Sequence, residues 1–154
     1  MERLFNVLAV FSTGLLAGAF LYGFSTVVPT FYEVPLEVHF AYRDALMRHN
    51  GIYMQLVMGM SILTPVLWAF LMHGPASSRL LAISASSFAA ISFVVTRFGN
   101  VPVNRMIKTW SAAAPPDGYE RLLSRWLMFN NIRTGAALLC FICLITATTS
   151  FKKQ

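Results

Sequence analysis

Four apolar segments, each able to cross a bilayer as a helix, are the feature of this sequence that most constrains its fold. They cover about residues 4–28, 51–72, 80–97 and 118–151. A hydrocarbon core about 30 Å thick needs roughly 20 apolar residues in helical form. Because 56% of the residues are hydrophobic and only 12% are charged, the chain lacks the polar surface of a water-soluble protein. We therefore predict an all-α membrane protein, a four-helix transmembrane bundle in which residues 1–154 form a single domain.

The segment between the first two apolar segments, residues 35–50, mixes charged and apolar side chains at helical spacing. It opens with a proline, which suits a first helical turn, and it places Glu37 and Arg43 among Phe40 and Leu46. This pattern predicts an amphipathic helix that lies on the bundle or caps it.

The number of spans fixes which connections share a side of the membrane. Four spans place both termini on one side, together with residues 73–79, and leave most polar segments on the other side. The net charge is +6, but the basic residues lie around the ends of the spans, which indicates lipid headgroups rather than nucleic acid as their partners. We expect a multi-pass integral membrane protein with cytoplasmic termini.

The third and fourth segments carry polar side chains on one helical face each. Arg97 and Asn100 share a face of the third, and Trp126, Asn130 and Arg133 form a stripe on the fourth. Because the third segment ends and the fourth begins on the same side, we expect the two arginines to meet in one pocket with apolar walls. The alternative for Arg133 is that it reaches the lipid headgroups.

The end of the third segment contains a Gly-Asn pair followed by Pro102, and we expect the helix to end there. Proline disfavours helical geometry at the preceding residue, Val101. The chain would then turn and hold Asn100 and Asn104 near Arg97. Their amides could satisfy freed backbone groups or donate to oxygen atoms of a ligand.

Three features within the apolar segments are best explained by packing. Gln55 lies about one turn into the second segment, where an unpaired amide is costly, so we expect it to face the interior. Gly14 and Gly18 form a GxxxG pattern, which indicates close helix packing within the bundle or between copies of the chain. Cys140 and Cys143 form a CxxC inside an apolar helix, and we interpret them as small buried residues rather than a redox pair.

The spacing of the histidines gives little indication of a metal site. Such a site would use Glu37, His39 and His49, but these residues lack the HxxxH or HxxE spacing of helical metal sites. We expect no cofactor, while the sequence alone leaves a haem or metal ion open.

Two motifs resemble those of a known family. The sequence NVPVN, a later tryptophan and the sequence RWLMFNNIR follow the patterns N-x-P-x-N and W-x3-N-x2-R. The chain thereby resembles the small four-helix membrane proteins of the anthrone oxygenase family. The residues that match are Asn100, Pro102 and Asn104, then Trp126, Asn130 and Arg133.

The resemblance implies an oxidoreductase that oxygenates a lipophilic aromatic substrate, such as an anthrone, without metal or flavin. A base near neutral pH would remove an acidic C–H proton, and His39 or His49 is the natural candidate. Cations and amides would stabilise the resulting oxyanion, and aromatic side chains would hold the rings. The residues expected in these roles are Arg97 and Arg133 as catalytic groups, with Arg43, Gln55, Asn100, Asn104, Trp110, Trp126 and Asn130 as substrate-binding groups.

A non-enzymatic function is the alternative. The GxxxG pattern and the aromatic-rich helix ends are also typical of an accessory subunit, or of a lipid- or pigment-binding module, in a larger membrane complex. A homo-oligomer is compatible with the same features. In either case membrane lipids and a lipophilic small molecule are the expected partners.

Overall fold

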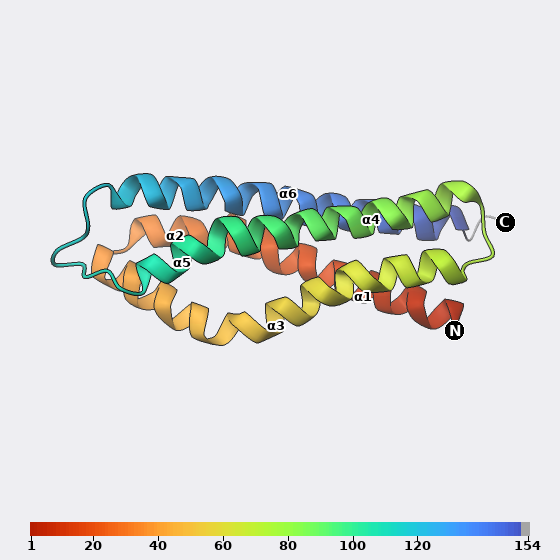
Figure 1. Ribbon diagram of the computed structural model, residues 1–154, viewed down its shortest axis with the longest axis horizontal. Coiled ribbons are helices and arrows are strands. Elements are labelled where there is room, and N and C mark those ends of the chain that lie inside the picture. Colours follow the sequence, from red (N-terminus) through yellow and green to blue (C-terminus); the bar gives the residue numbers. More distant parts are fainter. Residues whose placement is uncertain (152–154) are drawn as a thin grey trace.

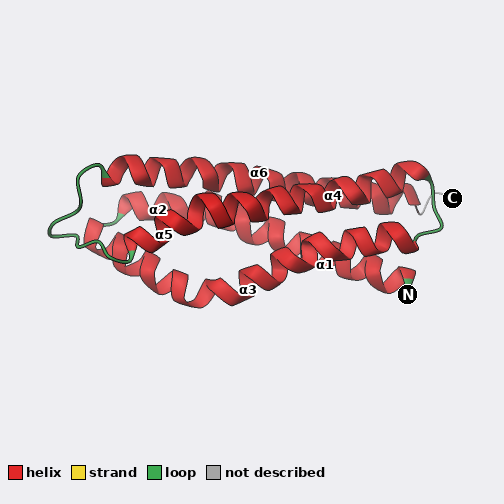
Figure 2. Cartoon of the chain, in the orientation of Figure 1, coloured by secondary structure: helices red, strands yellow, loops and turns green. Residues whose placement is uncertain are grey.

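The computed structural model describes residues 1–151, and these residues contain helices and no strands (Figure 2). The helical segments, in chain order, are α1 (Glu2–Tyr22), η1 (Gly23–Val27), α2 (Val28–Glu33), α3 (Leu36–Leu71), α4 (Ala76–Val95), η2 (Thr96–Asn100), α5 (Val101–Ile107) and α6 (Tyr119–Phe151). They join end to end into four long rods, of which the first is α1–η1–α2 and the third is α4–η2–α5 (Figure 1). The predicted all-α four-helix bundle is confirmed.

Each rod packs against two neighbours. α1 contacts α3 and α6, and α4 contacts the same two helices. Along both helices, buried residues recur at steps of three and four, and all but one of them are small, which lets the two backbones approach closely. These residues are Ala82, Ala85 and Ala89 in α4, and Ala137, Cys140, Leu144 and Ala147 in α6.

All four rods are long and apolar enough to cross a membrane, which confirms the expected multi-pass protein. The spans are Glu2–Glu33, Leu36–Leu71, Ala76–Ile107 and Tyr119–Ser150. Large apolar side chains such as Phe11, Phe70 and Phe98 are exposed on the outside of the bundle, where lipid would cover them. At a rise of about 1.5 Å per residue, each rod is longer than a hydrocarbon core of about 30 Å, so all four extend beyond it.

The amphipathic segment expected between the first two spans forms the first turns of α3. The helix begins after Pro35, whose carbonyl accepts a hydrogen bond from the His39 N–H at 3.0 Å. It then runs through Gly51 to Leu71 without interruption. The amphipathic part and the second span are therefore one continuous helix.

The beginning of α1 and the end of α6 lie at the same end of the bundle, together with the α3–α4 turn (Figure 1). The longest connection, residues 108–118, lies at the opposite end with the α2–α3 turn. This arrangement agrees with the expected topology. The cytoplasmic location of the termini stays a prediction.

The expected helix end at Pro102 is wrong, because the chain changes its helical pitch there instead of turning. In η2 the Val101 N–H donates to the Thr96 carbonyl, five residues back, and Val101 is helical with φ −61° and ψ −42°. A π-helical turn accommodates the missing N–H of Pro102 and shifts the carbonyls that its ring would meet in an α-helix. The helix therefore continues to Ile107.

The first rod repeats this arrangement. In η1 the Val28 N–H donates to the Gly23 carbonyl, again five residues back, and Pro29 follows immediately. Two rods thus contain a π-helical turn one residue before a proline. Such turns re-aim side chains and are common at functional sites.

The GxxxG pattern does not bring two backbones together at both glycines. A Cβ added to Gly14 would lie 3.2 Å from Cε2 of Phe141, whereas a Cβ on Gly18 would have nothing within 4 Å. α1 packs instead through a different face, which includes Leu16 and Phe20. Gly18 therefore faces outward, and any packing role for it lies outside the single chain.

Candidate functional site

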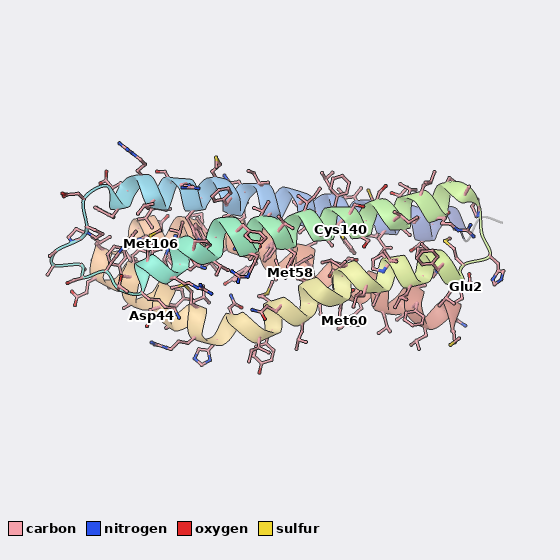
Figure 3. All side chains as sticks on the ribbon, in the orientation of Figure 1. Glu2, Asp44, Met58, Met60, Met106 and Cys140 are labelled. Atoms are coloured by element: carbon pink, nitrogen blue, oxygen red, sulfur yellow. The ribbon has the colours of Figure 1, made fainter. Side chains whose placement is uncertain are left out.

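A pocket of about 730 Å³ lies among the four rods in the half of the bundle that faces residues 108–118. Both π-helical turns contribute to it, through Gly23 and Val27 on one side and Thr96 and Arg97 on the other. Its apolar wall consists mainly of Phe20, Val28, Phe31, Leu46, Met47, Met54, Met58, Phe93 and Val101. In Figure 3 this region extends from Met106 and Asp44 toward Met58.

The charged lining of the pocket is entirely cationic. Among the described residues, no carboxylate lines it, and its cations are Arg43, Arg97, Arg105, Lys108 and Arg133. The three cations of the third rod all line the pocket: Arg97 in η2, Arg105 in α5, and Lys108 directly after the end of α5. A pocket with apolar walls and several uncompensated positive charges favours an aromatic or lipophilic ligand that carries negative charge.

Two of these arginines lie around the ring of Trp126. The guanidinium carbon of Arg43 is 4.0 Å from the Trp126 ring centroid and 4.6 Å from that of Phe31. The guanidinium carbon of Arg133 is 5.8 Å from the Trp126 centroid and 4.5 Å from that of Phe20. The aromatic faces attract the cations, but they do not neutralise them. The ion pairs found in residues 1–151 involve other residues, Arg48 with Asp44 and His73 with Glu2.

Side-chain amides hold this arrangement in place. Asn130 Oδ1 accepts hydrogen bonds from Nη2 of Arg133 at 2.8 Å and from its Nε at 3.2 Å. Trp126 Nε1 donates to Asn104 Oδ1 at 2.7 Å, which ties α6 to α5. Asn130 Nδ2 is buried without a hydrogen-bond partner.

Most of the expected site residues come together at this pocket. Those that line it are Arg43, Gln55, Arg97, Asn104, Trp126, Asn130 and Arg133. Arg133 does not simply extend to the lipid headgroups, since its guanidinium group is bound to Asn130.

Four other expected residues lie outside the lining. Asn100 is buried between helices, where its Nδ2 donates to the Trp126 carbonyl at 3.0 Å. Trp110 packs edge-on against Phe40 in a second apolar cluster. His49 is exposed, whereas His39 is buried next to Arg43 and its ring stacks on Phe31 with centroids 5.0 Å apart.

Sequence reasoning did not single out Arg105 and Lys108, which line the pocket. Their spacing in the sequence pointed to the pocket, since they follow Arg97 at eight and eleven residues, close to two and three turns of a helix. The expected helix end at Pro102 hid this relationship.

The residues considered for a metal site and for a redox pair, among them His39 and Cys140, lie outside the pocket lining. Within residues 1–151, no group of three histidine, cysteine or carboxylate side chains lies close enough to hold a metal ion. Cys140 is buried and belongs to the apolar core, and in Figure 3 it lies further from the Met106 end than Met58 does.

The fold and the pocket together define a class: a small four-span membrane protein with a cationic, apolar-walled site between its helices. The chain belongs to the anthrone oxygenase family, because the family model described as "Anthrone oxygenase" matches residues 46–143, well over half of its length. The matched region contains α4, η2 and α5 completely, together with large parts of α3 and α6. No curated protein and no solved structure matches the chain.

Proposed function

We propose that this protein is an integral membrane oxygenase that acts on a lipophilic aromatic, anthrone-like substrate in the pocket around Trp126. The observation that carries the proposal is the lining of the pocket, which combines apolar walls with five cationic side chains and no carboxylate among the described residues. Membership of the anthrone oxygenase family supports the same reaction class.

The chemistry that fits this site begins with loss of a proton from the carbon between two aromatic rings. The resulting carbanion is delocalised onto the carbonyl oxygen, so the substrate becomes an aromatic oxyanion. A cationic environment stabilises this anion relative to the neutral substrate and so promotes its formation. Arg43 and Arg133 are the cations nearest to Trp126 that can supply this stabilisation.

The electron-rich anion then reacts with dioxygen. Two C–H bonds of the methylene group break, one oxygen atom becomes the new quinone carbonyl, and the other leaves as water. The substrate supplies all four electrons that reduce dioxygen, so the reaction balances without an external reductant. The proposal accordingly assigns no metal ion or flavin to the site.

The proton acceptor in this proposal is water at the pocket mouth. Neither His39 nor His49 lines the pocket, and no carboxylate of the described residues does. The exposed cations Arg97, Arg105 and Lys108 lie on the same pocket and would favour departure of a proton over its return. The arginines thus lower the free energy of the anion, and solvent accepts the proton.

A route from the bilayer fits a lipophilic substrate. A smaller pocket of about 310 Å³ adjoins the first one, and the two share Tyr22, Val27, Phe31 and Tyr42. Its remaining lining comes from the first rod, the α2–α3 turn and the beginning of α3, through Thr26, Thr30, Val34 and Val38. A substrate dissolved in lipid could therefore reach the main pocket between α1–η1–α2 and α3.

The direct test uses purified protein in neutral detergent with an anthrone under ¹⁸O₂. The proposal predicts quinone with one ¹⁸O atom, formed without added cofactor, and oxygen consumed in a one-to-one ratio with substrate. The Arg43→Met variant should lose most of this activity, because it retains side-chain bulk but removes a buried pocket cation. A rate equal to that of boiled protein would contradict the proposal.

A binding or accessory subunit is the second candidate. One observation favours it: Gly18 lies on the outside of α1 with nothing within 4 Å of an added Cβ, so another helix could approach there. Native mass spectrometry from solubilised membranes separates the candidates. Stable association with larger subunits, together with no turnover of anthrone by the isolated chain, would favour the accessory function.

A further inference from the structure

We infer that Arg43 and Asn130 form a pair of hydrogen-bond donors for an anionic oxygen of the ligand, and that His39 is the positioning residue that holds Arg43 for it. The inference rests on the proposed function for the identity of the substrate, but it concerns binding and is tested separately from turnover. It assigns His39 a function other than that of a base.

Two donors without hydrogen-bond partners mark this oxygen-binding site. Arg43 and Asn130 each have only 3% of their surface exposed, and both line the pocket. Nη2 of Arg43 and Nδ2 of Asn130 are buried without a hydrogen-bond partner. Buried donors without acceptors are rare because they give up their hydrogen bonds to water, so an acceptor from a bound ligand is the natural completion of this site.

The two donors are organised around one aromatic ring. The Arg43 guanidinium carbon lies 4.0 Å from the Trp126 ring centroid, and Asn130 is one helical turn beyond Trp126 on α6. Asn130 Oδ1 binds Arg133, which orients the amide so that its Nδ2 is left for another acceptor. A planar aromatic oxyanion held at Trp126 would therefore meet an amide donor and a guanidinium donor.

His39 fixes the orientation of Arg43. Nε of Arg43 donates to Nε2 of His39 at 2.8 Å, and the His39 ring stacks on Phe31 with an interplanar angle of 6°. The Arg43 guanidinium carbon also lies 4.6 Å from the Phe31 centroid. The guanidinium group is thus held through Nε and by two aromatic faces, which leaves Nη2 available for the ligand.

The hydrogen bond from Arg43 determines which ring nitrogen of His39 carries the proton. Since Nε2 accepts a hydrogen bond from Arg43, it carries no proton, and a neutral His39 has its proton on Nδ1. To act as a base, Nε2 would have to break this bond and become cationic beside a buried guanidinium group. The geometry therefore favours a role for His39 in orienting Arg43 over a role in proton transfer.

The test compares two aromatic probes that differ in charge, anthracene-9-carboxylate and its neutral carboxamide, by fluorescence titration in neutral detergent. The His39→Leu variant cannot accept from Arg43 and should lose about tenfold or more in affinity for the carboxylate, with the carboxamide changed less than about twofold. The His39→Gln variant retains an acceptor oxygen and should recover most of the carboxylate affinity. His73→Leu, a change at an exposed histidine of the opposite end, is the matched control.

Further variants keep the test decisive if the His39→Leu protein is unstable. Arg43→Lys retains the charge but loses the planar donor group, so it should also reduce the preference for the carboxylate.

Equal affinity losses for both probes, or failure of His39→Gln to restore carboxylate binding in a protein with wild-type thermal stability, would overturn the inference. Displacement of the probe by phosphatidylglycerol but not by an anthrone phenolate would assign the site to lipid headgroups and would also overturn it. A clear carboxylate preference without anthrone turnover would contradict the proposed oxygenase and leave this site intact.

Discussion

The guanidinium group of Arg43 lies over the ring of Trp126, with its central carbon 4.0 Å from the ring centroid. Trp126 in turn donates from Nε1 to Asn104, so one side chain of α6 connects the cation of α3 with the amide of α5. The contact joins two helices that are not neighbours in the bundle, since α3 and α6 each pack against α1 and α4. Trp126 therefore organises the pocket across its width.

Removal of the Trp126 ring should disable the site more than loss of its N–H. We expect Trp126→Leu to lower kcat/KM for an anthrone by about tenfold or more, because the aromatic face for Arg43 is lost. Trp126→Phe keeps an aromatic face and loses only the bond to Asn104, so it should retain the larger part of the activity. Steady-state kinetics on both purified variants checks this order, and equal kcat/KM values in the two would contradict it.

Arg97 of the third rod and Arg133 of the fourth should differ in their response to lysine. Arg133 makes two hydrogen bonds to Asn130, which a lysine cannot reproduce in the same geometry, so Arg133→Lys should lower turnover about tenfold or more. Arg97 is exposed, and its guanidinium carbon lies 5.9 Å from the ring centroid of Phe98, so Arg97→Lys should remain within about threefold of wild type. Oxygen consumption with anthrone measures both. A wild-type rate for Arg133→Lys would show that the two hydrogen bonds from Arg133 to Asn130 have no part in catalysis.

The packing of η2 against α6 depends on Gly99. A Cβ on Gly99 would lie 2.5 Å from Cγ of Phe129, so Gly99→Ala should force the helices apart and destabilise the protein by about 1–3 kcal/mol. Gly135→Ala is the control: no atom lies within 4 Å of its added Cβ, and alanine favours the helix by up to about 1 kcal/mol. Thermal unfolding in detergent compares the two, and an unchanged midpoint for Gly99→Ala would exclude the close contact.

The cysteines should be dispensable for activity. Cys140 and Cys143 are free thiols in α6, and Cys140 packs in the apolar core away from the pocket lining. Replacement of both by alanine should leave kcat within about twofold of wild type, with a stability loss of about 1–2 kcal/mol from the smaller core side chain. A loss of turnover in the folded double variant would instead support a thiol mechanism.

The sequence predicted the parts of this molecule that follow from length and periodicity. Four apolar segments of sufficient length specify four spans, and a helical face shared by Trp126, Asn130 and Arg133 places all three on the pocket. These inferences need only the helical repeat and the thickness of the bilayer.

The remaining features depend on contacts between segments distant in the chain. Pro102 suggested a helix end, but a π-helical turn can absorb a proline, and the packing of Gly99 against Phe129 is not encoded in local sequence. The burial of His39 against Phe31 likewise arises from the fold-back of α3 on α2. A histidine that appears in sequence as a candidate base is, in three dimensions, the hydrogen-bond acceptor of Arg43.

The most direct test of the central claim, that the cations of this pocket stabilise an aromatic oxyanion, is an anaerobic spectrophotometric pH titration of an anthrone bound to the purified protein. Without oxygen the bound substrate can ionise but cannot react, so its spectrum reports the fraction present as anion. We predict that wild-type protein lowers the pH of half-ionisation by about one unit or more relative to the same detergent without protein, and that Arg43→Met abolishes most of this shift. A bound anthrone that ionises at the same pH as in empty micelles would contradict the account.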